Sequence, residues 1–292
     1  MTKDPHLGLV VVGYESTAQW TPFLLSLEQS TITPSQVVLV DNSPPSGPSP
    51  DVTRWKKTDV IRLPHNPGYG AAVNVGMSAL DRDVTHVIVA NPDIRFQPNT
   101  IKKLQEELTA FPQAAIAGPA LQNSDGTLYP SARAIPGLRI GVGHALLGNL
   151  WPSNPWTRRY LGDYRHQESR AVGWVSGALF LVDRACFSKV SGFDERFFMF
   201  FEDVDLCHRM KKAGYRTIYV PEARALHEGG HSTHPRMSEM VKAHHQSARL
   251  FLESLYPRRY QAPLRVLLRA GLAARSILQQ WKYRRLERLG GR

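Results

Sequence analysis

Cysteine is scarce in this sequence of 292 residues, which contains only Cys186 and Cys207. Two thiols cannot build a disulfide framework, and their spacing does not suit a metal site, so we expect both to be reduced, as in a cytosolic protein. Long apolar runs are missing as well: nowhere do about 18 apolar residues follow one another, which excludes a membrane-spanning helix. The segment from Met1 to Leu7 carries Asp4 and His6 and predicts no standard export signal.

Acidic residues are also few relative to basic ones, with 25 Asp and Glu against 36 Lys and Arg. The resulting net charge of +11 and a pI near 9.8 imply an anionic partner. Nucleic acid, a phosphorylated small molecule and an acidic membrane surface are all compatible with this charge. A hydrophobic content of 42% is ample for the core of one large domain, with or without an appendage.

The first 110 residues alternate short β-branched runs with helix-forming segments. The expected strands are residues 7–14, 36–40, 60–63 and 86–90, and the expected helices are 21–28, 70–80 and 99–110. This alternation predicts an α/β fold with a mostly parallel sheet covered by helices on both faces. Because ligands bind at the carboxyl ends of such strands, the polar residues that follow them are candidates for a functional site.

The rest of the chain is less regular. Residues 118–170 are rich in Pro, Gly and Trp, and we expect loops there around one helix at 138–147. A strand is predicted over 172–182, a turn at 187–190, a helix over 202–213 and a strand at 217–220. Beyond His234 the sequence becomes helical and basic, with ten Lys and Arg residues against the single acid Glu287 between positions 258 and 292.

Two polar turns follow expected strands in the first half. Asp41 ends the second strand, where a carboxylate can accept hydrogen bonds from a base or ribose, although Asp-Asn-Ser is equally suited to capping a turn. Asn66, Gly68, Gly70 and Asn74 form a glycine-spaced turn into a helix, where the backbone can approach a phosphate. The spacing is not that of the dinucleotide-binding fingerprint, so an ordinary turn explains it equally well.

An acid and a histidine could form a metal site at the same edge. Asp93, in Asn91-Pro92-Asp93, follows the apolar strand 86–90 and could bind a hard divalent cation that also contacts a diphosphate, or the three residues could simply end the strand. His227 and His231 follow the strand at 217–220. A single histidine more often packs or lies on the surface, but imidazole there could complete the Asp93 site.

Three acids, Glu202, Asp203 and Asp205, come directly after the aromatic run at 197–201. Acids at the start of a helix are favourable caps, which accounts for one of the three. A carboxylate in an apolar, partly dry pocket is also a candidate general base that could remove a proton from a hydroxyl. Asp203 and Asp205 diverge on a helix, so at most one of them should face a given substrate atom.

Seven stretches, in this order, resemble the inverting GT-A-fold glycosyltransferases of family 2, and within them bacterial rhamnosyltransferases. They are VVGYES, VDNS at Asp41, HNPGYGAAVNVG from His65, ANPDIRF from Ala90, GWVSGALFLVDR from Gly173, GFDERFFMFFEDVDLCHRMKKAGY from Gly192 and VPEARALHEGGHST from Val220. YPSAR at Tyr129 and WPSNPWT at Trp151 resemble enzymes that add rhamnose to N-acetylglucosamine on a polyprenyl diphosphate. The resemblance covers most of the chain.

The resemblance implies a Rossmann-like GT-A domain over residues 1–235 and a basic amphipathic helical extension over 236–292. A nucleotide-sugar half would reach about residue 125, and an acceptor half would span 126–235. The implied donor-binding residues are Tyr14, Glu15, Asp41, Asn66, Gly70, Asn74 and Asn91. The implied acceptor-binding residues are Trp174, Ser176, Gly177 and Glu202. Asp93 and His227 would be the metal ligands.

The implied reaction is a single displacement with inversion, in cell-wall biosynthesis at the arabinogalactan linkage unit. Asp203 would take the proton from the 3-hydroxyl of N-acetylglucosamine on polyprenyl diphosphate, and that oxygen would attack the rhamnose of dTDP-L-rhamnose. A divalent cation, Mg²⁺ or Mn²⁺, would bind the leaving dTDP. Asn91 stands where many relatives carry an acid, and its amide would be a weaker ligand.

Other functions stay open on the residues alone. Another nucleotide sugar or a polysaccharide acceptor would need no different motif. A sugar nucleotidyltransferase would need a glycine- and lysine-rich phosphate loop after the first strand, which residues 13–16 do not provide. Nucleic-acid binding is not expected, because basic and aromatic residues do not interleave on a stacking platform.

The basic C-terminal segment predicts a helix that lies on an anionic membrane. The apolar stripe is Leu264, Leu267, Leu268, Leu272 and Leu278, flanked by Arg265, Arg269 and Arg275. The alternative is a helix that packs this stripe on the core or on a second copy in a homo-oligomer. We expect a peripheral protein on the cytoplasmic side of the plasma membrane, where a polyprenyl acceptor is found.

Overall fold

The structure is a computed structural model, and it describes residues 2–44, 46–47, 52, 55, 58–148, 150–229 and 237–290. The strands are β1 (Thr2–Gly13), β2 (Ile32–Asp41), β3 (Thr58–Arg62), β4 (His86–Ala90), β5 (Ile94–Phe96), β6 (Ala114–Gln122), β7 (Leu128–Tyr129), β8 (Ala132–Arg133), β9 (Arg170–Val172), β10 (Trp174–Val175), β11 (Leu179–Asp183) and β12 (Arg216–His227). The helices are α1 (Thr17–Glu28), α2 (Tyr69–Ala79), α3 (Thr100–Ala110), α4 (Leu138–Leu147), α5 (Pro155–Leu161), α6 (Arg184–Lys189), α7 (Glu202–Lys212), α8 (Met237–Leu255) and α9 (Ala262–Gly290).

Within these described ranges, ten strands form one mixed sheet. Eight follow the order β3-β2-β1-β4-β11-β6-β12-β5, while β7 pairs with β6 and β9 pairs with β12. β1 to β4 run parallel to one another, and so do β6 and β12. β11 lies antiparallel between β4 and β6 and joins the two parallel groups. The expected mostly parallel sheet is therefore confirmed, with an antiparallel strand at its centre.

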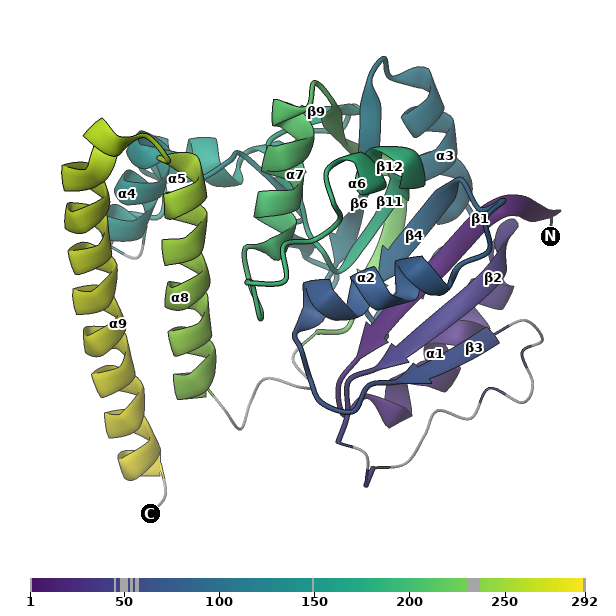
Figure 1. Cartoon of the computed structure of the whole chain (residues 1–292), viewed down its shortest axis with the longest axis horizontal. Helices are drawn as coiled ribbons and strands as arrows, with labels where there is room; N and C mark the ends of the chain where they lie inside the picture. Colours follow the sequence, from purple (N-terminus) through teal and green to yellow (C-terminus); the bar gives the residue numbers. More distant parts are fainter. Residues whose placement is uncertain are drawn as a thin grey trace.

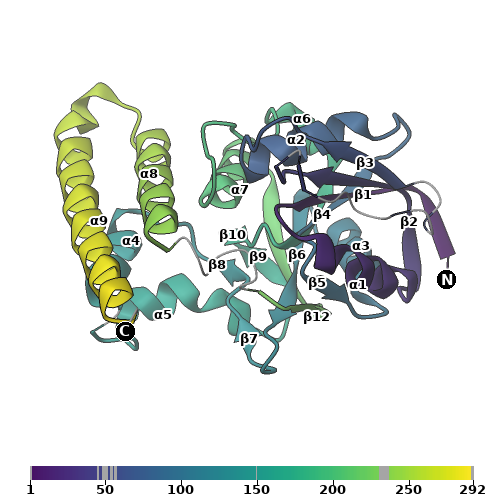
Figure 2. The same cartoon turned by 90° about the horizontal axis from the view of Figure 1, so that it is seen from below.

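The sheet is buried on both faces, which explains the nearly continuous apolar runs of its central strands. Along β1, Val10 and Val12 face one hydrophobic cluster, whereas Leu9 and Val11 face another, because side chains alternate along a strand. Helices α2, α6 and α7 cover one face and α1 and α3 the other (Figure 2). The edge formed by the carboxyl ends of β1, β2 and β4 stays open to ligands.

Sequence reasoning located the first four strands and three helices, with ends that differ by a few residues. It was wrong where loops were expected from residue 118, because β6 continues through Gly118 and Pro119. Proline cannot donate a ladder hydrogen bond, but the register of β12 shifts directly after Val220, the partner of Pro119. The expected turn at 187–190 lies largely in α6, and the expected strand at 172–182 is divided into β9, β10 and β11.

Helices α8 and α9 form an antiparallel hairpin beside the sheet, next to α4 (Figure 1). Phe251 of α8 is buried against the core, and Ser247 Oγ donates to the Met199 carbonyl at 2.8 Å. The expected leucine stripe of α9 is split: Leu264, Leu268 and Leu272 are half-buried, whereas Leu267 is 70% exposed. The Leu278 side chain lies outside the described residues. No helix in the described part of the chain is long and apolar enough to cross a membrane.

Gly68 positions the turn into α2 and tolerates no side chain. Its φ of +102° favours glycine, and a β-carbon there would lie 2.3 Å from the Phe198 carbonyl oxygen. Gly126 also has a positive φ, +80°, but a β-carbon there would meet nothing within 4 Å.

We predict that Gly126→Ala lowers the free energy of unfolding by about 1–2 kcal/mol through backbone strain. Gly68→Ala should cost about 1–3 kcal/mol more because of the clash. Urea unfolding measures the free energy of unfolding of both variants. Equal losses of stability in the two variants would contradict the predicted clash at Gly68.

Candidate active site

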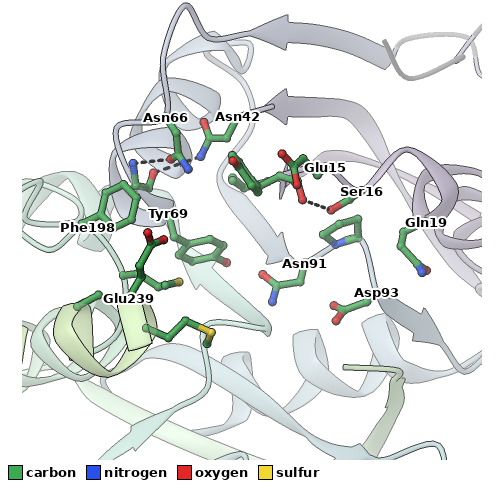
Figure 3. A pocket seen from close by; sticks show the side chains of 18 of the residues that line it. Glu15, Ser16, Gln19, Asn42, Asn66, Tyr69, Asn91, Asp93, Phe198 and Glu239 are labelled. Atoms are coloured by element: carbon green, nitrogen blue, oxygen red, sulfur yellow. Dashed lines mark hydrogen bonds between the residues drawn. The ribbon is translucent and has the colours of Figure 1, made fainter. Parts of the chain in front are cut away.

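A cavity of about 450 Å³ lies at the carboxyl ends of β1, β2 and β4, where the sequence predicted a site. Its lining includes Tyr14, Glu15, Ser16, Gln19, Asn42, Asn66, Tyr69, Asn91, Asp93, Phe198, Met199, Glu239 and Met240. Figure 3 shows these side chains converging from the ends of several strands, with Glu239 reaching in from α8. Four of the expected donor-binding residues, Tyr14, Glu15, Asn66 and Asn91, therefore share one cavity.

The turn that carries Asp93 is fixed by backbone and side-chain hydrogen bonds. The backbone N–H of Asn91 donates to the Ala178 carbonyl at 2.9 Å, just before β11. Arg95 donates to the Pro92 carbonyl at 2.8 Å and to the Glu228 carboxylate at 2.6 Å. These contacts hold the end of β4 against β11 and β12, so the Asp93 side chain has a defined position in the cavity.

Asp93 and His227 meet across β5 and β12. The distance between His227 Nε2 and Asp93 Oδ2 is 3.4 Å, and both side chains are largely buried. Asp93 Oδ1 is buried without a hydrogen-bond partner among the described residues. A carboxylate and an imidazole could together hold a hard divalent cation, with further ligands from a bound diphosphate. No group of three such side chains occurs in the described residues, and His231 lies outside them.

Tyr69 was not predicted, yet it stands between two cavities and lines both. Its hydroxyl donates to the Gly177 carbonyl at 2.5 Å. Burial raises the pKa of Tyr69 well above its usual value, and the charges of Glu202, Asp203 and Asp93 add to this rise. The phenol is therefore neutral and acts as a fixed wall. Tyr69 lies between Gly68 and Gly70 in the stretch HNPGYGAAVNVG, and this position was a signal that sequence reasoning could have used.

Three expected donor-binding residues do not line the cavity. The Asp41 carboxylate accepts hydrogen bonds from Arg62 Nη2 at 2.8 Å and from the Ser43 amide at 3.0 Å. The Asn74 side chain bonds both the amide and the carbonyl of Phe193 at 2.9 Å. Gly70 gives room to the Phe193 ring. The structure places these residues behind the lining, where they support the turns that form it.

A second cavity, of about 470 Å³, adjoins the first at Tyr69, Asn91 and Met199. All expected acceptor-binding residues line it, together with the expected base: Trp174, Ser176, Gly177, Glu202 and Asp203. His227 also belongs to its lining. The expected metal ligands and the expected base therefore line two adjoining cavities.

Strained backbone precedes the two acids. Phe200 and Phe201 have φ values of 70° and 65°, in the left-handed region that non-glycine residues rarely adopt. Such strain is held by the surrounding packing and is common at functional sites. The turn at Phe200 and Phe201 leads directly into α7, whose first two residues, Glu202 and Asp203, line the second cavity. Asp205 instead pairs with Arg209 at 2.6 Å and lines neither cavity, in agreement with the predicted divergence from Asp203.

The carboxylates of Glu202 and Asp203 share a dry environment. Burial raises the pKa of Glu202 to about 8, and the nearby negative charge of Asp203 contributes to the rise. Burial also raises the pKa of Asp203, but amide hydrogen bonds from Gly177 at 2.9 Å and Val204 at 2.8 Å oppose that rise. Glu202 therefore keeps its proton near neutral pH, whereas the two amide hydrogen bonds favour the charged form of Asp203.

Residues 5–249 match the family described as "Glycosyltransferase like family 2", so the chain belongs to that family. It is 40% identical to the N-acetylglucosaminyl-diphospho-decaprenol L-rhamnosyltransferase of Mycobacterium tuberculosis strain H37Rv, over 93% of this chain and 92% of the relative. It is 38% identical to rhamnosyltransferase WbbL of Escherichia coli K12, over 28% of this chain and 31% of that protein.

Solved structures agree on the fold, which is GT-A-like. The structure of GalNAc-T7 with UDP, GalNAc and Mn²⁺ matches with a TM-score of 0.57 and 14% identity, covering 81% of this chain and 48% of that one. The mannosyltransferase PcManGT from Pyrobaculum calidifontis, with GDP-Man and Mn²⁺, gives 0.55 and 15%, covering 84% and 62%. At these identities the likeness concerns the fold alone.

The raised pKa of Glu202 predicts a pH-dependent stability. Between about pH 5 and pH 8, the folded protein keeps the Glu202 proton that the unfolded chain has lost. Unfolding therefore releases a proton, and the free energy of unfolding falls as pH rises. The slope is at most about 1.4 kcal/mol per pH unit. In Glu202→Gln this contribution is absent, so the variant should gain on the wild type toward pH 8. Urea unfolding at four pH values, with exposed Glu168→Gln as control, measures the difference. If the free energy of unfolding of Glu202→Gln differed from that of the wild type by the same amount at every pH, the raised pKa of Glu202 would be contradicted.

Proposed function

We propose that the chain transfers L-rhamnose from dTDP-L-rhamnose to the 3-hydroxyl of N-acetylglucosamine on a polyprenyl diphosphate, in cell-wall biosynthesis. The observation that carries this proposal is the junction of the two cavities, with Asp93 on one side and Asp203 on the other. The mycobacterial relative, alike over nearly its whole length, supports the choice of donor sugar and acceptor. Other nucleotide sugars are the alternative donors.

The first cavity takes the donor in this proposal. Glu15, Asn42 and Asn66 supply polar groups for the nucleoside, and Tyr14 supplies an aromatic surface. Asp93 and His227 hold Mg²⁺ or Mn²⁺, which when bound stabilises the negative charge of the diphosphate leaving group. The buried oxygen of Asp93, which has no hydrogen-bond partner among the described residues, supports this assignment. The amide of Asn91 lies beside the site as a weaker ligand.

The second cavity takes the acceptor sugar. Asp203 accepts the proton of the 3-hydroxyl as that oxygen forms a bond to the anomeric carbon of rhamnose. The bond from that carbon to the phosphate oxygen breaks, and dTDP leaves with its electron pair from the opposite side, so the configuration inverts. Burial moves the pKa of Asp203 upward, which makes it a better base, while its two amide hydrogen bonds fix its direction.

The direct test supplies the full chain with a panel of nucleotide sugars and a lipid-linked N-acetylglucosaminyl diphosphate, and measures nucleotide release and product linkage. We expect turnover with dTDP-L-rhamnose. In Asp203→Asn, turnover should fall about a hundred- to ten-thousandfold, because general-base catalysis is lost. Binding of dTDP should be unchanged. Exposed Asp125→Asn serves as the matched control. Wild-type turnover in the Asp203 variant would refute the assignment of the base.

We also propose that α9 attaches the enzyme to the cytoplasmic face of the plasma membrane, where its lipid-linked acceptor lies. Val266, Leu267, Ile277 and Trp281 are all more than 60% exposed, and they fall on one side of the helix at 3.6 residues per turn. The half-buried leucines occupy the opposite side. These four residues form an exposed apolar row in a strongly basic segment, which suits the interface of an anionic bilayer.

Vesicle flotation tests this attachment. Leu267→Ser, Ile277→Ser and Trp281→Ser combined should reduce binding to vesicles rich in phosphatidylglycerol, because the apolar contacts with the bilayer are lost. The matched control is Val60→Ser, Val75→Ser and Leu128→Ser, which changes three exposed apolar residues of the catalytic body. Undiminished flotation of the α9 variant would refute membrane attachment through this row. If the α9 variant instead lost mass in light scattering, the row would bind a second copy of the chain.

A further inference from the structure

Arg133 is a positively charged residue of the second cavity to which the proposed function gives no role. It ends β8, which pairs with β10 so that Arg133 faces Trp174 across the two strands. Both residues line the cavity that also holds Glu202 and Asp203. The short pairing of β8 with β10 thus brings a guanidinium group into the space proposed for the acceptor.

Arg133 is held in place by aromatic rings and one backbone bond. Its guanidinium carbon lies 5.0 Å from the centre of the Trp174 ring and 5.8 Å from that of Tyr160. Nε donates to the Pro130 carbonyl at 2.8 Å. The group also hydrogen-bonds the Tyr160 hydroxyl, which opposes the rise that burial causes in the pKa of that phenol. The side chain is oriented before any ligand arrives.

Arg133 carries a charge that acts on Asp203, whose pKa it lowers, without a direct ion pair between described residues. In the described part of the chain, no carboxylate forms a salt bridge with it. Among the described residues that line this cavity, it is also the one Lys or Arg. His244 is no substitute, because burial lowers the pKa of its imidazole to about 4. A guanidinium with these properties matches the geometry and charge of a phosphate group.

Helix α5 connects this cavity with an exposed apolar surface. Tyr160 lines the cavity, and Trp156, one turn earlier on the same side of α5, is 39% exposed. Leu150 and Trp151, just before α5, are 85% and 51% exposed. Indole side chains are typical of membrane interfaces. A lipid chain that leaves the cavity beside Tyr160 would therefore meet apolar side chains along α5.

We propose that Arg133 binds the diphosphate of the acceptor, and that it thereby selects acceptor sugars carried on a diphosphate. The inference rests on the proposed function, since it places the acceptor sugar against Asp203. The 3-hydroxyl and the anomeric oxygen of that sugar lie one ring apart. The proton acceptor and the diphosphate site must therefore line the same small cavity, as Asp203 and Arg133 do.

Two acceptors with the same alkyl chain test the proposal. One carries N-acetylglucosamine through a diphosphate, and the other is the uncharged β-glycoside. For Arg133→Gln we expect KM for the diphosphate acceptor to rise about ten- to a hundredfold, the loss typical of one charge-assisted contact. KM for the glycoside should not change. The pH dependence of kcat should shift upward to the same extent on both acceptors, because the charge of Arg133 lowers the pKa of Asp203. Arg133→Lys should recover part of the loss. Arg165→Gln, which removes a neighbouring arginine outside the cavity, is the matched control.

The outcomes separate several explanations. Equal losses on both acceptors would mean that Arg133 acts only through Asp203 and would overturn the proposal. Binding of the diphosphate acceptor without donor, followed by tryptophan fluorescence, is independent of turnover. Binding that depends on Arg133 without any rhamnose transfer would refute the proposed function and leave the diphosphate site standing. Binding that Arg133→Gln does not weaken would refute the diphosphate site, provided that thermal unfolding shows a folded variant.

Discussion

The antiparallel pairing of β11 with β4 is the contact on which the whole site depends. It aligns Leu179 with Ala90, so the residues just before β11 lie beside those just after β4. The Asn91 amide bonds the Ala178 carbonyl there, and the neighbouring Gly177 accepts from Tyr69 and donates to Asp203. One strand pairing thus links the lining of the first cavity to that of the second. Without it, the two cavities would belong to separate halves of the molecule.

Buried charge is the second constraint, and it is balanced locally. The cost of burying a carboxylate is offset differently at three positions. Asp41 forms an ion pair with Arg62, Asp203 accepts amide hydrogen bonds, and Glu202 keeps its proton. Of the three residues, only Asp203 has a negatively charged oxygen that faces a cavity and forms no bond with a basic side chain. This difference explains why similar residues near one sheet edge support different roles.

Sequence reasoning reached the family, and eleven of its fourteen candidate residues line one of the two cavities, because short motifs mark the ends of the strands. It could not distinguish residues that line the cavities from those that support them. Asp41 ends β2 and Asn74 lies within α2, and only the structure shows that their side chains bond Arg62 and Phe193 and do not line a cavity. β6 was missed because Gly118-Pro119 has the composition of a turn. Glu239 was missed for another reason: it reaches the first cavity from α8, far along the chain, and no local pattern encodes that contact.

The position of α9 also gives the molecule an electrical asymmetry. Residues 258–292 carry ten basic residues and one acid, and so hold nine of the eleven net positive charges, while the catalytic body is nearly neutral. Because the α8–α9 hairpin lies to one side of the sheet (Figure 1), this charge is displaced from the centre of mass. An anionic surface would exert a torque on the freely diffusing enzyme as well as an attraction. The enzyme would therefore turn before it touched such a surface, and added salt would weaken this alignment.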